Sequence, residues 1–205
     1  MFKRKILSKL EAWKRDERHK PLILRGARQV GKTTVVNEFG SQFDNYLYFN
    51  LEMNESVRLF EMDIPLNDLV NMLFASLGKS QREGSTLIFI DEIQNSPKTI
   101  ALLRYFYEQR PDLYVIAAGS LLENLVDVNV SFPVGRVMYM ALRPCSFYEF
   151  LGAIGKTNLL AVLSQKPEYT VAFHDQLIHQ FNQYTIIGGM PEAVQRYAET
   201  QDIVA

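Results

Sequence analysis

The fold of this chain is decided by one stretch, Gly26-Ala27-Arg28-Gln29-Val30-Gly31-Lys32-Thr33, which reads G-x-x-x-x-G-K-T. This is the pattern of a phosphate-binding loop, or Walker A motif. Its glycines let the backbone approach phosphate oxygens where a β-carbon would obstruct it. Successive backbone N–H groups then face the phosphates, and the helix that follows adds the positive end of its dipole.

The residues that close the pattern supply charge and a metal ligand. Lys32 is expected to place its ammonium between the β- and γ-phosphates, and Thr33 to offer its hydroxyl to Mg²⁺. The sequence therefore predicts a phosphate site made of Gly26, Ala27, Arg28, Gln29, Val30, Gly31, Lys32, Thr33 and Thr34.

The flanking sequence supports this interpretation of the motif. An apolar run of the buried-strand type, Pro21 to Leu24, precedes the loop. After the loop, residues 32–39 can form a helix with Val35, Val36 and Phe39 on one face, and Gly40 can end it. Strand, glycine loop and helix in this order are the context that a true phosphate loop requires.

Composition limits the classes of protein that fit. The 205 residues suggest one domain, or a core with a small appendage, and 47% hydrophobic residues are ample for a packed core. The net charge of −1 gives no global attraction to nucleic acid. Cys145 is the only cysteine, which excludes an internal disulfide and a four-cysteine zinc site. No signal peptide or membrane-length apolar run is recognisable, so we expect a cytoplasmic protein without membrane contact.

The N-terminal residues 1–18 predict an amphipathic helix. Its basic residues are interleaved with acidic residues and with apolar Ile6, Leu7, Leu10 and Trp13, a pattern typical of a solvated basic face. A local patch for nucleic acid stays open, and its charges would come from Lys3, Arg4, Lys5, Lys9, Lys14, Arg15 and Arg18.

Near-continuous apolar runs alternate with helical spacing up to about residue 142. We expect strands over residues 21–25, 46–51, 86–90, 113–118 and 136–142, with helices between them, including a short one over 121–125. Such runs are typical of a parallel sheet that is covered on both faces. The predicted fold class is therefore α/β, a P-loop NTPase with a five-stranded, mostly parallel sheet between helices.

After Pro144 the strand signals stop. Residues 146–152, 158–164, 173–185 and 191–199 have helical character and form too short a segment for an independent enzyme. We expect a core over residues 1–144 and a helical subdomain over 145–205, of the right size for a lid over a nucleotide.

The second acidic motif follows the third expected strand. Leu87-Ile88-Phe89-Ile90 is followed directly by Asp91-Glu92. Ligands of open parallel sheets bind at the carboxyl ends of strands, so Asp91 can hold Mg²⁺ together with Thr33. Glu92 can orient and deprotonate an attacking water, which favours hydrolysis over transfer to an acceptor.

Two further residues each admit two interpretations. Ser120, after the fourth strand, can sense the γ-phosphate, or it can cap a helix with Glu123 at the capping-box position, and both can hold at once. Arg136 can reach into a neighbouring subunit's site and stabilise transition-state charge, or it can be a structural or solvent-facing arginine.

The full set of motifs resembles the AAA+ ATPase superfamily, and more narrowly a prokaryotic family of predicted AAA+ ATPases. The likeness extends from the two motifs to Ala117-Ala118-Gly119-Ser120, Gly135-Arg136, the segment from Leu142 to Phe150, and Gly188-Gly189-Met190-Pro191. The resemblance implies that Pro191 packs on the adenine, that Ser120 is the first sensor and that Arg136 lies in the arginine-finger region. Arg196 is a candidate lid arginine only by its proximity to Pro191. The preference for ATP over GTP also comes from the resemblance.

Members of this family usually continue past the lid into a C-terminal domain, which we expect to be missing from a chain that ends at Ala205. The expected function is Mg²⁺-dependent ATP binding and hydrolysis coupled to a conformational switch on a partner. One alternative is a nucleotide-gated binding module with negligible turnover, and another is a DNA-binding factor with a regulatory ATPase. The sequence leaves open the partner, the pathway and whether the chain forms a homo-oligomer.

Overall fold

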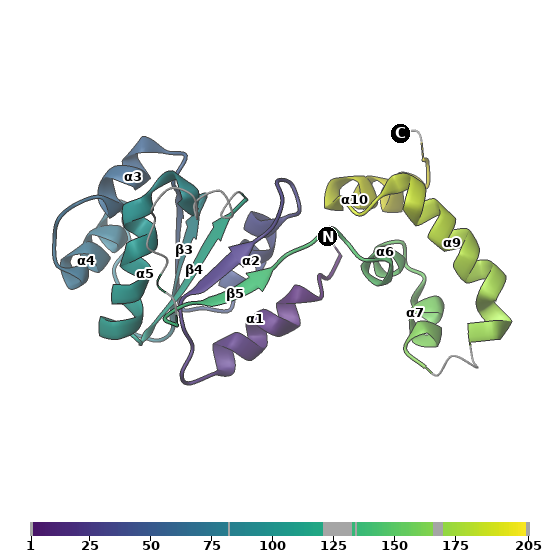
Figure 1. Cartoon of the computed structure of the whole chain (residues 1–205), viewed down its shortest axis with the longest axis horizontal. Helices are drawn as coiled ribbons and strands as arrows, with labels where there is room; N and C mark the ends of the chain where they lie inside the picture. Colours follow the sequence, from purple (N-terminus) through teal and green to yellow (C-terminus); the bar gives the residue numbers. More distant parts are fainter. Residues whose placement is uncertain (1, 82, 121–132, 134, 166–169, 204–205) are drawn as a thin grey trace. The chain divides into compact units, whose positions relative to one another are not determined.

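The chain folds into two compact units. The computed structural model describes residues 2–81, 83–120, 133, 135–165 and 170–203. One part, the sheet unit, comprises residues 8–28 and 32–142, and the other, the helical unit, comprises residues 1–7, 29–31 and 143–205 (Figure 1). By its contacts, the tip of the phosphate loop therefore groups with the helical unit.

The described part of the sheet unit contains five strands that all run parallel. They are β1 (Leu22–Arg25), β2 (Asn45–Asn50), β3 (Thr86–Asp91), β4 (Leu113–Gly119) and β5 (Met138–Ala141), in the order β2-β3-β4-β1-β5. The predicted α/β fold with a parallel five-stranded sheet is confirmed. The fifth strand is shorter than the predicted 136–142, because within the described residues it pairs with β1, which is four residues long.

Helices cover both faces of this sheet (Figure 1). The helices α3 (Asn54–Phe60), α4 (Leu66–Ser76) and α5 (Pro97–Gln109) share one apolar core with alternate strand residues such as Ile88, Ile90 and Val115. On the other face, Trp13 of α1 (Ile6–Arg15) meets the rings of Phe39 in α2 (Lys32–Gly40) and of Tyr114 in β4. The period of two along the strands thus gives each face its own helices.

Two helix starts show how the sequence sets boundaries. Ser96 caps α5 by accepting a hydrogen bond from the Thr99 N–H, and Pro97 occupies the first helical position, as the Ser-Pro pair predicts. In contrast, α1 begins at Ile6 rather than at the chain's start. The backbone before it is not helical, and the Arg4 side chain is buried within the helical unit.

The helical unit contains α6 (Phe147–Ala153), α7 (Thr157–Leu163), α9 (His174–Ile187) and α10 (Pro191–Thr200), with a 3₁₀ turn at Val171–Phe173. These helices confirm the predicted helical character of this region. Its buried centre is formed by Cys145, Phe150, Val194 and Tyr197. The short helix expected over 121–125 lies outside the described residues.

No helix in the described part of the chain combines the length and the apolar character needed to cross a lipid bilayer.

The glycine pair before α10 yields a stability prediction. A β-carbon on Gly189 would lie 2.6 Å from the Cys145 carbonyl oxygen, and the Cys145 N–H donates to the Gly189 carbonyl at 2.6 Å. We expect Gly189→Ala to lower the free energy of unfolding by about 1–3 kcal/mol, because backbone rather than a flexible side chain must shift. Urea denaturation of the purified protein measures this loss.

Gly152→Ala is the matched control. A β-carbon on Gly152, in α6, would meet only Leu160 at 3.6 Å, which is an ordinary contact. Alanine there should leave stability unchanged or raise it by up to about 1 kcal/mol through helix propensity. Equal effects of the two substitutions would contradict the tight approach at Gly189.

Candidate functional site

Two residues of the phosphate loop have left-handed backbone conformations. Gln29 and Gly31 both have positive φ, at 64° and 86°. Gly31 suits this conformation because it lacks a β-carbon, whereas Gln29 adopts it as one of three described non-glycine residues with positive φ. Alternating backbone conformations of this kind turn successive N–H groups into a concave anion site.

Lys32 is the first residue of α2, and its side chain folds back onto the start of the loop. Its ammonium donates to the carbonyl oxygens of Gly26 and Ala27, each at 2.9 Å, and the residue is only 6% exposed. Burial lowers the pKa of Lys32 below its ordinary value, and the nearby carboxylates of Glu92 and Asp91 partly counter this shift. The lysine is thus a buried cation whose hydrogen bonds go to loop carbonyls, and phosphate oxygens can replace these acceptors.

The two expected metal ligands are in direct contact. The Thr33 hydroxyl donates to Asp91 Oδ2 at 2.6 Å, so α2 and β3 meet at this point. Asp91 is 3% exposed, and burial raises the pKa of its carboxyl despite the hydrogen bonds from Thr33 and from the Glu92 N–H.

This donor set fits Mg²⁺. The ion prefers hard oxygen ligands and in phosphate sites commonly uses one or two protein groups, with waters and phosphates completing its shell. Among the described residues no group of three or more His, Cys, Asp or Glu side chains could hold a metal ion alone. A hydroxyl beside one carboxylate therefore suits a metal that arrives with a nucleotide.

Glu92 stands in a constrained conformation. Its φ and ψ of 54° and 44° are left-handed, which for a residue other than glycine costs on the order of 1–3 kcal/mol. Its carboxylate accepts a hydrogen bond from the Gln94 side-chain amide at 2.5 Å. The sequence gives no signal for this contact of Gln94 with the acid, and the 3₁₀ turn Ile93–Asn95 brings the two side chains together.

Ser120 lies at the same edge of the sheet as Asp91. Because β4 pairs with β3 on one side and with β1 on the other, the residue after β4 follows the carboxyl ends of both neighbours. The Ser120 hydroxyl is buried and has no hydrogen-bond partner among the described residues. Its expected capping partner, Glu123, lies outside them.

Arg136 lies at the opposite edge. It precedes β5, whose first residue, Met138, pairs with Leu22 at the start of β1. Its guanidinium bonds with Glu108 of α5 at 2.5 Å, and Arg104 binds the same carboxylate at 3.0 Å. The structure therefore does not bring Arg136 together with Lys32 and Asp91.

In the helical unit, the glycine pair places Pro191 beside the loop tip. Gly188 has φ 79°, and Pro191 is the first residue of α10. A β-carbon on Gly31 would lie 3.8 Å from Pro191 Cγ. The residue expected to pack on a base is thus a near neighbour of the second loop glycine.

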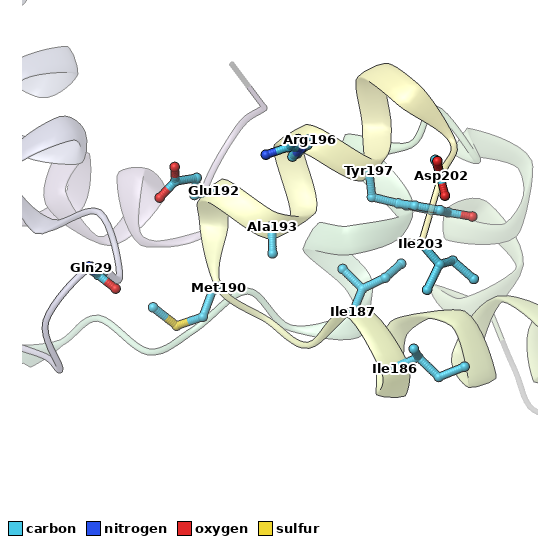
Figure 2. Close-up of a pocket in the computed structure, with 10 residues that line it drawn as sticks. All are labelled: Gln29, Ile186, Ile187, Met190, Glu192, Ala193, Arg196, Tyr197, Asp202 and Ile203. Atoms are coloured by element: carbon cyan, nitrogen blue, oxygen red, sulfur yellow. The ribbon is translucent and has the colours of Figure 1, made fainter. Parts of the chain in front are cut away.

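A pocket of about 370 Å³ opens in the same unit (Figure 2). Figure 2 shows that its side chains come from the end of α9, from α10 and the tail after it, and from Gln29 of the loop. Arg196, Glu192 and Asp202 supply its charges, while the apolar side is made by Ile186, Ile187, Met190, Ala193 and Ile203. Arg196 is therefore a pocket residue, and no described ion pair holds it.

The N-terminal basic residues do not form one solvated face. Arg4 is only 5% exposed and forms an ion pair with Glu149, whose side chain is also buried. Lys5 is exposed, and its ammonium lies 3.5 Å from the centre of the Tyr148 ring. The interleaved pattern of charges concealed this burial, because Arg4 alternates with lysines that do face solvent.

Comparison with known proteins finds a matching family model and solved structures of similar fold. A family model described as an AAA domain matches residues 18–151, which is more than half of the chain. The fold is similar to that of a Walker-type ATPase, PABY2304 of Pyrococcus abyssi, with a TM-score of 0.56 and 18% identity over 100% of this chain and 69% of that one. It is also similar to C. elegans PCH-2, with a TM-score of 0.49 and 12% identity over 97% and 63% of the two chains. Among curated proteins none matches this sequence.

The buried carboxyl at the centre of the site predicts a pH-dependent gain of stability. Since the folded-state pKa of Asp91 is raised, its charge at pH 7 opposes folding. We expect Asp91→Asn to raise the melting temperature at pH 7 in Mg²⁺-free buffer by about 2–4 °C, which corresponds to about 1 kcal/mol at this size. The gain should shrink as the pH falls through the raised pKa toward 3.8, where wild-type Asp91 becomes protonated in both states.

Asp112→Asn is the control with the opposite sign. The Arg110 guanidinium lowers the pKa of Asp112, so this charge favours folding above pH 3.8 and its removal should lower the melting temperature at pH 7. A loss of stability in both variants would contradict the assignment of Asp91 as a strained, desolvated charge.

Proposed function

The chain belongs to the AAA domain family, and we propose that it binds ATP with Mg²⁺ and hydrolyses it, switching a partner surface as it does so. In this proposal Lys32 and the loop amides hold the phosphates, Thr33 and Asp91 hold Mg²⁺, and Glu92 positions the attacking water. The observation that carries it is the direct contact of Thr33 with Asp91 beside a buried Lys32.

The charges of the site support phosphate binding. Lys32 now donates to two loop carbonyls, so a phosphate would replace neutral acceptors by charged ones, which make stronger hydrogen bonds. The bound Mg²⁺ would supply a positive charge that neutralises the phosphate oxygens. It would also compensate the buried charge of Asp91, whose raised pKa marks it as poorly solvated.

Hydrolysis rather than binding alone depends on Glu92. An acid directly after the metal-binding aspartate can take the proton from water, whereas a transfer to another acceptor has no need of such a base at this position. Ser120, with a buried hydroxyl that lacks a partner among the described residues, is proposed as the sensor of the γ-phosphate. Pro191, near Gly31, is proposed to pack against the adenine.

Two observations favour a second function, a nucleotide-gated binding module with slow turnover. The Glu92 carboxylate is engaged by the Gln94 amide, so it must be released before it can act as a base. A monomer would also lack an arginine from a neighbour, since its own Arg136 lies at the far edge of the sheet. Slow hydrolysis by a single chain would suit both features.

Two substitutions separate binding from hydrolysis. Lys32→Ala should abolish measurable ATP binding, because it removes the cation that faces the phosphates. Glu92→Gln keeps the shape and should leave the affinity for ATP nearly unchanged, while it lowers kcat by about a hundredfold or more, the typical contribution of a general base. Calorimetric titration with ATP and a steady-state phosphate-release assay measure the two effects.

The slow-turnover alternative has its own signature in the same assays. If wild type and Glu92→Gln bind ATP equally and release phosphate at the same negligible rate, the chain is a binding module. An absence of ATP binding by the wild type, with or without Mg²⁺, would contradict the proposal as a whole.

The role of Arg136 can be tested against a matched arginine. If it completes a neighbour's site, specific activity should rise with protein concentration, and Arg136→Ala should remove that rise and lower kcat by about a thousandfold, as arginine fingers do. Arg104→Ala removes the other arginine bound to Glu108 and should leave kcat unchanged. Identical kcat values for both variants would instead assign Arg136 to the surface ion pair alone.

A further inference from the structure

One buried guanidinium joins three segments of the helical unit. Arg4 Nε donates to Glu149 Oε1 at 3.0 Å, one terminal nitrogen donates to the Val30 carbonyl at 3.0 Å, and the other donates to the Arg143 carbonyl at 2.7 Å. Arg4 is 5% exposed, so these bonds are shielded from water. The three acceptors lie in the phosphate loop, in the segment after β5 and in α6.

The bond to Val30 fixes a peptide plane of the phosphate loop. Val30 is fully buried and lies between Gln29 and Gly31, the two loop residues with positive φ. In a trans peptide the C=O of one residue and the N–H of the next point in opposite directions. Because the Val30 carbonyl faces Arg4, the Gly31 N–H is directed away from Arg4. A flip of this peptide would place the Val30 carbonyl, instead of the Gly31 N–H, on the side away from Arg4.

The other end of the guanidinium is anchored by a carboxylate that cannot easily move. Glu149 Oε1 also accepts the Lys5 N–H at 2.9 Å, and Oε2 accepts the Ser146 N–H and hydroxyl at 2.9 and 3.1 Å. Ser146 in turn caps the Glu149 N–H, which completes a capping box at the start of α6. The position of Arg4 is therefore set by the first turn of this helix.

We propose that Arg4 is a positioning residue for the nucleotide site, which holds the Val30–Gly31 peptide with its N–H turned toward phosphate and ties that orientation to α6 through Glu149. The proposal rests on the proposed ATP binding. It assigns the N-terminal segment before α1 a part in nucleotide affinity, although Arg4 itself does not touch the nucleotide.

Arg4→Lys is the sharpest test, because it keeps one positive charge for Glu149 and loses the fork that reaches all three acceptors. We expect its Kd for ADP to rise about tenfold to a hundredfold, the range for loss of a charge-assisted hydrogen bond. The KM for ATP should rise by the same factor while kcat changes by less than about twofold. The contact that is weakened, from the Gly31 N–H to phosphate, is equal in the ground and transition states. Calorimetry and steady-state assays are run at a temperature where circular dichroism shows the variant folded.

Controls and a second variant keep this test independent of folding. Lys3→Met removes the exposed neighbouring charge and should leave the Kd for ADP unchanged. Glu149→Gln removes the anchor and should raise the Kd by a smaller factor than Arg4→Lys, so it replaces that variant if the lysine protein does not fold. Wild-type Kd values in folded Arg4→Lys and Glu149→Gln would overturn the proposal and leave Arg4 a purely structural residue.

A nucleotide-free measurement separates this proposal from the proposed function. Amide hydrogen exchange of the loop in the apo protein should be about tenfold faster in Arg4→Lys than in wild type, and unchanged in Lys3→Met. If wild type binds no ADP but this acceleration is seen, the ATPase proposal fails while the loop-holding role stands. Unaltered loop exchange together with unaltered ADP affinity would overturn the loop-holding role itself.

Discussion

The parallel pairing of β3, β4 and β1 is the constraint on which the site of the sheet unit depends. Because all three strands run in one direction, their carboxyl ends share an edge. Asp91 at the end of β3, Ser120 after β4 and the loop after β1 all lie along that edge. The contact between Thr33 and Asp91 is the direct consequence, since it joins the helix after the loop to the end of β3. Arg136 precedes its strand, so the same constraint places it at the other edge.

The sheet and its motifs could be predicted because their signals are local. Apolar runs such as Leu87 to Ile90, the Ser96-Pro97 helix start and the glycines of the loop each determine backbone within a few residues. The burial of Arg4 could not be predicted in this way. Its acceptor Glu149 is 145 positions away in sequence, and a single basic residue among lysines has no periodicity that marks it as buried. The contact of Gln94 with Glu92 likewise depends on a left-handed residue in a 3₁₀ turn.

The ion pair of Arg4 with Glu149 contributes more to the local geometry of the phosphate loop than to the stability of the fold. Burying two charges costs several kcal/mol per ion, and the attraction between them repays this only with well-placed hydrogen bonds. Here the guanidinium has three acceptors and the carboxylate has four donors, so the remaining polar atoms are largely satisfied. An apolar pair of the same size could fill the space. An apolar pair could not, however, donate a hydrogen bond to the Val30 carbonyl. The contact with Val30 is therefore the reason to expect a charged residue at position 4.

The site of the sheet unit holds its groups in states that ligand binding would relieve. Asp91 is a desolvated acid, Lys32 is a desolvated cation bonded to neutral carbonyls, and Glu92 is held in a left-handed conformation. Each lowers the stability of the free protein, and each is a feature that residues chosen for folding alone would avoid. A ligand that brings both an anion and a divalent cation would pair with Lys32 and Asp91 at once. The complementarity of these two buried charges therefore supports the proposed binding of a metal-bound polyphosphate over binding of a phosphate alone.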